Sequence, residues 1–99
     1  MTFMSLEKNR TINKVRRKLD SLDNRLLNII KIRTKLVNQI LDKKTNKKQI
    51  VDKARINKIL KNIKKKSLKM KIDVKLTKMI WISIIKAYIN FEYRKFKKK

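Results

Sequence analysis

The chain has 99 residues, enough for one small domain, and its 31 Lys and Arg outnumber seven Asp and Glu to give a formal net charge of +24. It contains no Gly, Pro, Cys or His, which excludes disulfides, thiolate zinc sites and a histidine general base. HExxH, Walker A, GxGxxG and GxSxG motifs are excluded for the same reason, so any catalysis is expected to need no metal, nucleophilic triad or phosphate-cradling loop.

Apolar residues recur at alternating steps of three and four in the N-terminal part, which predicts one long helix over about residues 5–44. This apolar seam consists of Ile12, Val15, Leu19, Leu22, Leu26, Ile29, Leu36 and Ile40. The helix would be longer than the diameter expected of a 99-residue globule. We therefore expect a second chain to cover part of it, in an obligate dimer.

Two shorter helices are predicted to follow, over about 51–66 and 74–95. The polar stretch KKTNKKQ, residues 43–49, is expected to form the first connection, and KSLKMKID, residues 66–73, the second. Asp52 and Asp73 suit the N-termini of the two helices. The pattern predicts an all-α fold, with residues 1–99 forming a single domain of three helices.

Three charged residues interrupt apolar rows: Arg33, Lys44 and Glu92. If the first helix continues to residue 44, Lys44 returns to within about 20° of the azimuth of Arg33. Two cations on one side of a helix bundle favour an anion-binding pocket, because a buried charge is costly without a partner or ligand. The alternative is that Arg33 and Glu92 form a buried ion pair, or that these long side chains reach solvent.

Arg16 lies 17 residues before Arg33, roughly 25 Å away along a helix, so it cannot serve the same pocket within one chain. In an antiparallel dimer, Arg16 of one chain could enter the pocket of the other. The alternative is a solvent-exposed residue that pairs with Asp20, four residues later on the same face.

The charge of +24 indicates an anionic partner such as nucleic acid, an anionic membrane or a small anionic substrate. The alternative is the codon bias of an AT-rich genome, because Lys greatly outnumbers Arg while Gly and Pro are absent. We find no transmembrane segment or signal peptide in the sequence. A cytoplasmic protein with no membrane partner and only nonspecific nucleic-acid binding is expected.

The stretch NKVRRKLDSLDNRLLNIIKIRTKLVNQILDKK, residues 13–44, resembles the opening pattern xxRxxIDxLDxxLLxLLxxRxxLVxxIxxxK of the all-helical chorismate mutases, the AroQ class. VDKARINKIL, residues 51–60, resembles the second-helix motif of the family more weakly, and MIWISIIKAYINFE, residues 79–92, resembles the third. The resemblance implies an intertwined homodimer of three-helix protomers that converts chorismate to prephenate without a cofactor, in phenylalanine and tyrosine biosynthesis.

The resemblance also implies roles for the matching residues. Arg33, with Arg16 from the partner chain, would bind the two carboxylates of the substrate, and Arg55 would support them. Lys44 and Glu92 would donate to the ether oxygen whose bond breaks. Asp52 would contact the region of the substrate hydroxyl.

Two positions depart from the family pattern. Ile56 stands where a glutamate commonly binds the substrate hydroxyl, and Tyr88 stands where the family has Ser or Thr. Both would line the substrate site and could weaken binding or change substrate choice. Glu92 can donate only when it is protonated, so activity is expected to rise toward mildly acidic pH.

Other functions stay open on the sequence alone. Isochorismate-pyruvate lyase has the same fold and a related substrate. A family member that has lost catalysis would keep the fold without the activity. A basic helical nucleic-acid-binding protein would explain the charge, but not the cations in the seam or Glu92 in an apolar row.

Overall fold

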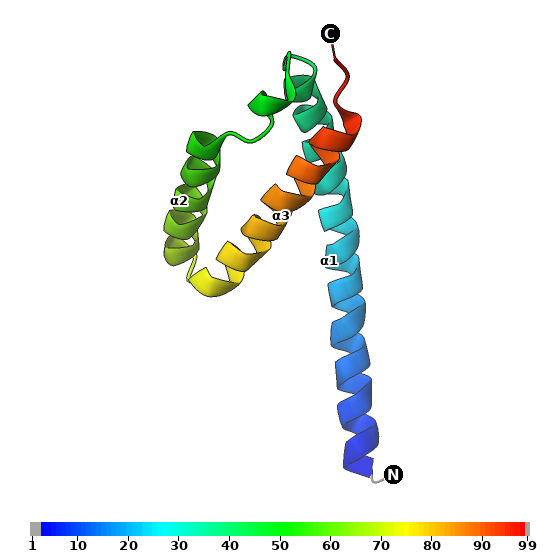
Figure 1. The fold of residues 1–99 in the computed structure, drawn as a ribbon. Coiled ribbons are helices and arrows are strands. Elements are labelled where there is room, and N and C mark those ends of the chain that lie inside the picture. Colours follow the sequence, from blue (N-terminus) through cyan, green and yellow to red (C-terminus); the bar gives the residue numbers. More distant parts are fainter. Residues whose placement is uncertain (1–2, 99) are drawn as a thin grey trace. The chain divides into compact units, whose positions relative to one another are not determined.

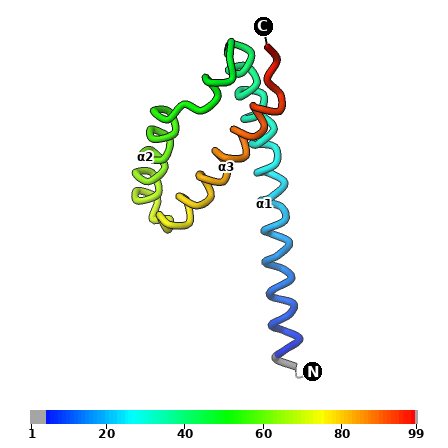
Figure 2. The backbone as a smooth tube through the Cα atoms, in the orientation of Figure 1, coloured from blue at the N-terminus to red at the C-terminus, as the bar shows by residue number. Residues whose placement is uncertain are grey.

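The computed structural model of the chain describes residues 3–98 and is all-α (Figure 1). Its elements in chain order are α1 (Phe3–Leu41), the short 3-10 helix η1 (Lys47–Gln49), α2 (Lys53–Lys69) and α3 (Val74–Lys95), and Figure 2 traces the backbone through them. No strand occurs in residues 3–98. The predicted helical fold with a long first helix is confirmed. None of the helices in this range has an apolar stretch long enough to cross a membrane.

The long helix α1 ends at Leu41, whereas the sequence predicted an end near Lys44. The backbone amide of Lys44 donates to the carbonyl of Leu41, three residues back, at 3.0 Å, so the chain tightens into a turn. Leu41 and Ile50 are buried at the two ends of the connection that follows. Because Lys44 lies outside the helix, the helical geometry from which the shared azimuth of Arg33 and Lys44 was predicted does not apply to Lys44.

The chain forms two compact units, one ending at Val37 and the other beginning at Asn38. Within the described residues, the first unit consists of α1 up to Val37, and much of its apolar seam is exposed to solvent. Six seam side chains are 49–58% exposed: Val15, Leu19, Leu22, Leu26, Ile29 and Leu36. Within the described residues, Leu41 and Ile50 are the only buried apolar ones. A single protomer therefore has very little core, and the predicted dimer stays a prediction.

In the second unit, α2 and α3 contact each other and run antiparallel (Figure 1). Two buried hydroxyls join the helices near their connection: Ser67 Oγ lies 2.8 Å from Thr77 Oγ1. Ser67 Oγ also donates to the carbonyl of Ile63, at 2.6 Å. Since buried polar groups are stable only when they are hydrogen-bonded, this pair fixes how one helix lies against the other.

The ends of α2 explain its bounds. The helix begins at Lys53, and not at 51, because Asp52 is its N-cap and accepts a hydrogen bond from the amide of Arg55 at 3.0 Å. It ends at Lys69, and not at 66. The amide of Ile72 donates to the carbonyl of Ser67, at 2.9 Å, and the intervening Lys71 has a φ of 58°. This is a Schellman ending with a lysine where glycine is usual.

Candidate active site

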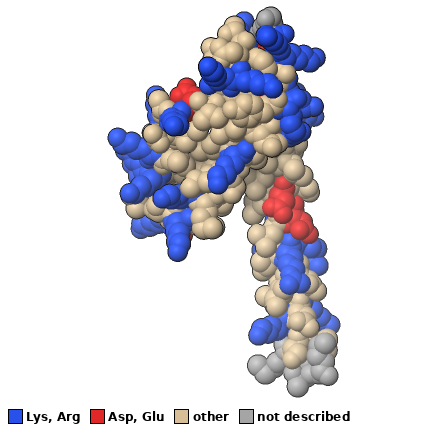
Figure 3. Space-filling view, in the orientation of Figure 1, with Lys and Arg blue, Asp and Glu red and all other residues tan. Residues whose placement is uncertain are grey.

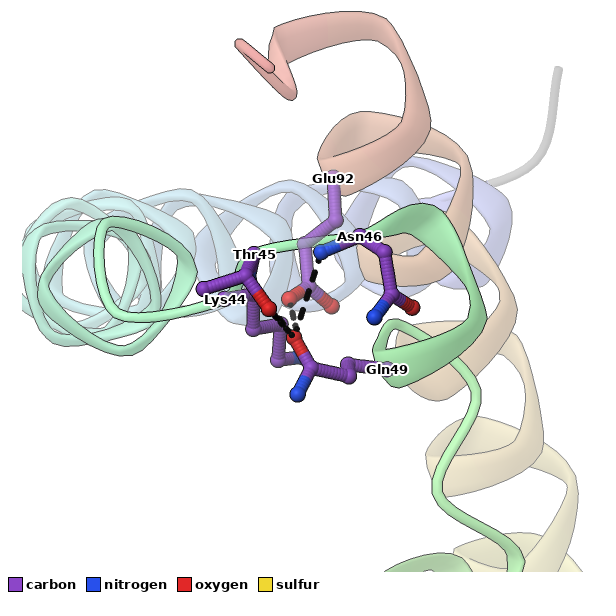
Figure 4. A network of polar contacts seen from close by, with 5 residues as sticks. All are labelled: Lys44, Thr45, Asn46, Gln49 and Glu92. Atoms are coloured by element: carbon purple, nitrogen blue, oxygen red, sulfur yellow. Dashed lines mark hydrogen bonds and ion pairs between the residues drawn. The ribbon is translucent and has the colours of Figure 1, made fainter. Parts of the chain in front are cut away.

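The centre of the candidate site is a close ion pair between Lys44 and Glu92 (Figure 4). Lys44 Nζ donates to Glu92 Oε1 at 2.8 Å, and the two side chains are only 17% and 10% exposed. Lys44 comes from the turn after α1, and Glu92 from the last turns of α3. The structure thus brings together the two residues that the sequence analysis assigned to catalysis. A charge-assisted hydrogen bond of this length in a partly dry site is strong.

A hydrogen-bonded loop positions Lys44. Gln49 Oε1 accepts hydrogen bonds from the amides of Thr45 and Asn46, at 2.6 and 3.3 Å, and from the hydroxyl of Thr45, at 3.3 Å. Figure 4 shows Gln49 reaching back to these two residues, directly after Lys44. This contribution of Gln49 was not predicted from the sequence, although the spacing from Asn46 to Gln49 is that of a capping box.

The end of α3 positions Glu92. Its carbonyl accepts a hydrogen bond from the amide of Phe96 at 2.8 Å, which closes the last turn of the helix. Tyr88, one turn earlier, is half-buried and packs edge-to-face on Phe91, with ring centroids 6.2 Å apart. Arg94 lies over the same Phe91 ring, at 5.9 Å from its centroid. The Phe91 ring, next to Glu92 in the sequence, therefore contacts Tyr88 and Arg94 on the helix surface.

The three predicted site residues of α2 lie in or beside its first turn. Asp52 and Arg55 have exposed side chains, and Ile56 is half-buried. The carboxylate of Asp52 already caps the helix. None of the three, all within the described chain, is hydrogen-bonded to Lys44 or Glu92. Their predicted contacts with a substrate stay predictions.

The two predicted arginine ligands belong to α1, in the first unit. Arg16 is exposed and Arg33 is half-buried. Because α1 is one continuous helix from Phe3 to Leu41, the 17 residues between them correspond to roughly 25 Å. One chain therefore cannot bring both arginines to one small ligand, as the sequence indicated.

The ion pair leaves donors for a ligand. A lysine ammonium has three N–H donors, and Glu92 accepts from it at one oxygen. An anion that reaches Lys44 could accept a second hydrogen bond without breaking the first. In the part of the chain that the structure describes, no group of three or more His, Cys, Asp or Glu side chains could hold a metal ion.

Comparison with known proteins gives one match. The family model described as chorismate mutase type II matches residues 15–93, which includes most of α1 and α3 and all of α2. The match confirms the family resemblance seen in the sequence. No curated protein and no solved structure shows significant similarity to the chain.

Proposed function

The chain belongs to the chorismate mutase type II family, and we propose on that premise that it is a homodimeric enzyme that rearranges chorismate to prephenate. The observation that carries the proposal is the contact between Lys44 and Glu92, because it joins the two positions assigned to the reacting ether oxygen. The product would supply phenylalanine and tyrosine biosynthesis.

The rearrangement makes modest demands on the protein. The substrate must be held in its compact conformer, and negative charge must be stabilised at the ether oxygen as the C–O bond breaks. Lys44 donates to that oxygen with an N–H that Glu92 does not use. The ion pair with Glu92 holds the ammonium in place before the substrate binds, so little reorganisation is needed during the reaction.

Arginine is suited to the two carboxylates because its planar guanidinium binds them through two parallel hydrogen bonds. Arg33 binds one carboxylate, and Arg16 of the partner subunit binds the other. The exposed seam of α1 supports a partner at this place, because exposed large apolar surfaces of this extent mark protein interfaces. The high positive charge also favours fast encounter with a dianion.

Loss of chorismate absorbance with purified protein tests the activity. Arg33→Ala should lower kcat/KM by about 100-fold or more, because it removes a bidentate, charge-assisted contact. Lys35→Ala is the matched control: it removes an exposed cation two residues away and should have little effect. If wild-type protein does not consume chorismate at any pH, the proposal is wrong.

Mixing two inactive variants tests whether the site is shared. In a hybrid dimer of Arg16→Ala and Arg33→Ala chains, one site has both arginines and the other has neither. An equal mixture should recover about a quarter of wild-type activity, because half of the dimers formed by random exchange are hybrids with one intact site. No recovery, with subunit exchange verified, would mean that each chain builds its site alone.

Ile56 and Tyr88 favour one alternative substrate. Neither the half-buried Ile56 nor an aromatic ring reproduces the short polar contacts that the family commonly offers at these positions. Isochorismate should therefore be assayed in parallel. Release of pyruvate from isochorismate without turnover of chorismate would assign the lyase reaction instead.

A further inference from the structure

The connection between α2 and α3 has an unusual surface. Residues 64–72, KKKSLKMKI, contain five lysines and three large apolar residues, and every one of the nine except Ser67 is exposed. Leu68 is 62% exposed and Met70 is 68% exposed, and Ile72 is 39% exposed. We call these nine residues the cationic corner.

The charge of the corner continues along α2. Eight of the 17 residues of this helix are Lys or Arg and none is acidic, so cations repeat at helical spacing without a compensating carboxylate. Like charges three or four residues apart destabilise a helix. Within the described chain, no lysine of α2 forms an ion pair. Figure 3 shows the Lys and Arg side chains projecting from this part of the molecule.

The helix dipole and codon bias explain the lysines of the cationic corner but not its exposed apolar residues. Lys66 and Lys69 lie in the last turn of α2, where cations interact favourably with the helix dipole. A lysine-rich codon bias explains further lysines. Neither explains why Leu68 and Met70 are largely exposed between lysines, while the neighbouring Ser67 is turned inward to Thr77.

We propose that the cationic corner binds the surface of membranes that contain anionic lipids, with Leu68 and Met70 entering the headgroup boundary. Basic side chains are attracted to an anionic leaflet, and flanking apolar side chains gain free energy when they leave water at its surface. Nucleic acid would attract the same lysines but offers no apolar environment to Leu68 and Met70. A second copy of the chain would instead change the oligomeric state when Leu68 and Met70 are replaced, and that outcome is part of the test below.

This inference departs from the expectation of no membrane partner, which rested on the absence of a spanning segment. The corner lies at one end of α3, and Glu92 lies near the other, about 27 Å along the helix axis. The Lys44–Glu92 pair is therefore not part of the cationic corner. The inference does not depend on the proposed function, because it requires no turnover.

Cosedimentation with vesicles tests the proposal at physiological ionic strength. The protein should bind vesicles of phosphatidylcholine with phosphatidylserine and should not bind vesicles of phosphatidylcholine alone. Lys65→Gln/Lys69→Gln should weaken binding about 30-fold, from the contribution of two lysines at an anionic surface. The matched control Lys95→Gln/Lys97→Gln removes the same charge at the far end of α3 and should change binding less than about threefold.

The apolar part of the proposal needs its own variant. Leu68→Ser/Met70→Ser keeps every charge and should weaken vesicle binding at least about tenfold. Because both side chains are exposed, helicity should be unchanged by circular dichroism. Met70→Ser alone, at the most exposed position, should give a smaller loss and serves as a second variant if the double one is unstable.

Four results would overturn the inference. The first is no binding to the anionic vesicles. The second is an equal loss in both lysine pairs, which would indicate a general effect of net charge. The third is unchanged vesicle binding in Leu68→Ser/Met70→Ser, with tighter, salt-dependent binding to duplex DNA. The fourth is a change of oligomeric state in that variant, which would indicate that another copy of the chain covers the corner.

Discussion

The ion pair between Lys44 and Glu92 leads to a prediction that separates stability from catalysis. Lys44→Met replaces the ammonium with an apolar side chain of similar length. It leaves the carboxylate of Glu92, a residue that is only 8% exposed, without the partner seen at 2.8 Å. Breaking a fully buried pair costs about 3–5 kcal/mol. Because both side chains retain some exposure to solvent, we expect a loss of about 3 kcal/mol in the free energy of unfolding.

Urea denaturation at one fixed protein concentration measures this loss, since unfolding of a dimer depends on concentration. Glu92→Gln is the matched variant. Its amide oxygen can still accept from Lys44, so it should cost less than about 1 kcal/mol. In Lys44→Met/Glu92→Gln no buried charge is left unpaired. The loss in the free energy of unfolding of the double variant should therefore be smaller than the sum of the two single losses by about 1–2 kcal/mol.

The free energy of unfolding and the activity on chorismate should respond differently to these variants. The double variant should regain stability relative to Lys44→Met but should stay inactive on chorismate, because the donor to the ether oxygen is gone. Additive stability effects would refute the reasoning, since they would mean that Lys44 and Glu92 are not coupled. A loss below about 1 kcal/mol for Lys44→Met would do the same, because it would show a pair fully screened by water.

Three further outcomes follow from single features of the structure. Glu92 accepts from Lys44 at 2.8 Å, so Glu92→Gln, whose amide oxygen can still accept, should retain more chorismate turnover than Glu92→Ala; equal losses would contradict a role of Glu92 in positioning Lys44. Lys71→Gly should stabilise the protein by about 1 kcal/mol, because Lys71 has a φ of 58°, whereas Lys65→Gly inside the helix should destabilise it by a similar amount in the same urea assay. Ser67→Ala and Thr77→Val should each lower the free energy of unfolding by about 1–3 kcal/mol, and the loss in the double variant should be smaller than the sum of the two. Additive losses would show that the 2.8 Å contact between the two hydroxyls contributes nothing to stability.

The sequence predicted the helices well where apolar spacing decides the structure. The seam from Ile12 to Ile40 specifies α1 because its steps of three and four match the helical repeat. Asp73 marks the start of α3, where its carboxylate accepts from the amide of Leu76 at 2.9 Å. These signals are local, so they can be read without knowledge of the rest of the chain.

The ends of α1 and α2 could not be read in the same way. Helices are usually recognised to end at Gly or Pro, and this chain has neither. Lys44 is a good helix former, yet it leaves the helix and pairs with Glu92, 48 residues later. Lys71 adopts a left-handed conformation that favours glycine, and the buried contact of Ser67 with Thr77 extends α2 up to that turn. Tertiary contacts overrode local preference in both places.

In the candidate site, too, local sequence signals predicted some features, while others depend on tertiary contacts or on a second chain. The apolar rows marked Lys44 and Glu92 only as two separate charges, and the family resemblance placed both at one substrate atom; their direct ion pair was not predicted, because it depends on how distant segments meet. Gln49 was missed because its amide acts on the backbone of the loop and not on the site itself. Arg16 depends on a second chain, so neither the sequence of one chain nor its fold can establish where it acts.

Codon bias explains the number of lysines in this protein more readily than it explains the places of its acidic residues. Only seven carboxylates occur among 31 cations, and random placement would leave most of them on open surface. Six of the seven are indeed exposed, and two of these, Asp52 and Asp73, cap the two shorter helices, whereas Glu92 is buried against Lys44. Two of these carboxylates stabilise helix ends and the third forms a costly buried pair that no local structure requires. A chain with a surplus of lysines has no need to bury a carboxylate for charge balance, so the buried position of Glu92 supports the role proposed for Lys44 toward a ligand.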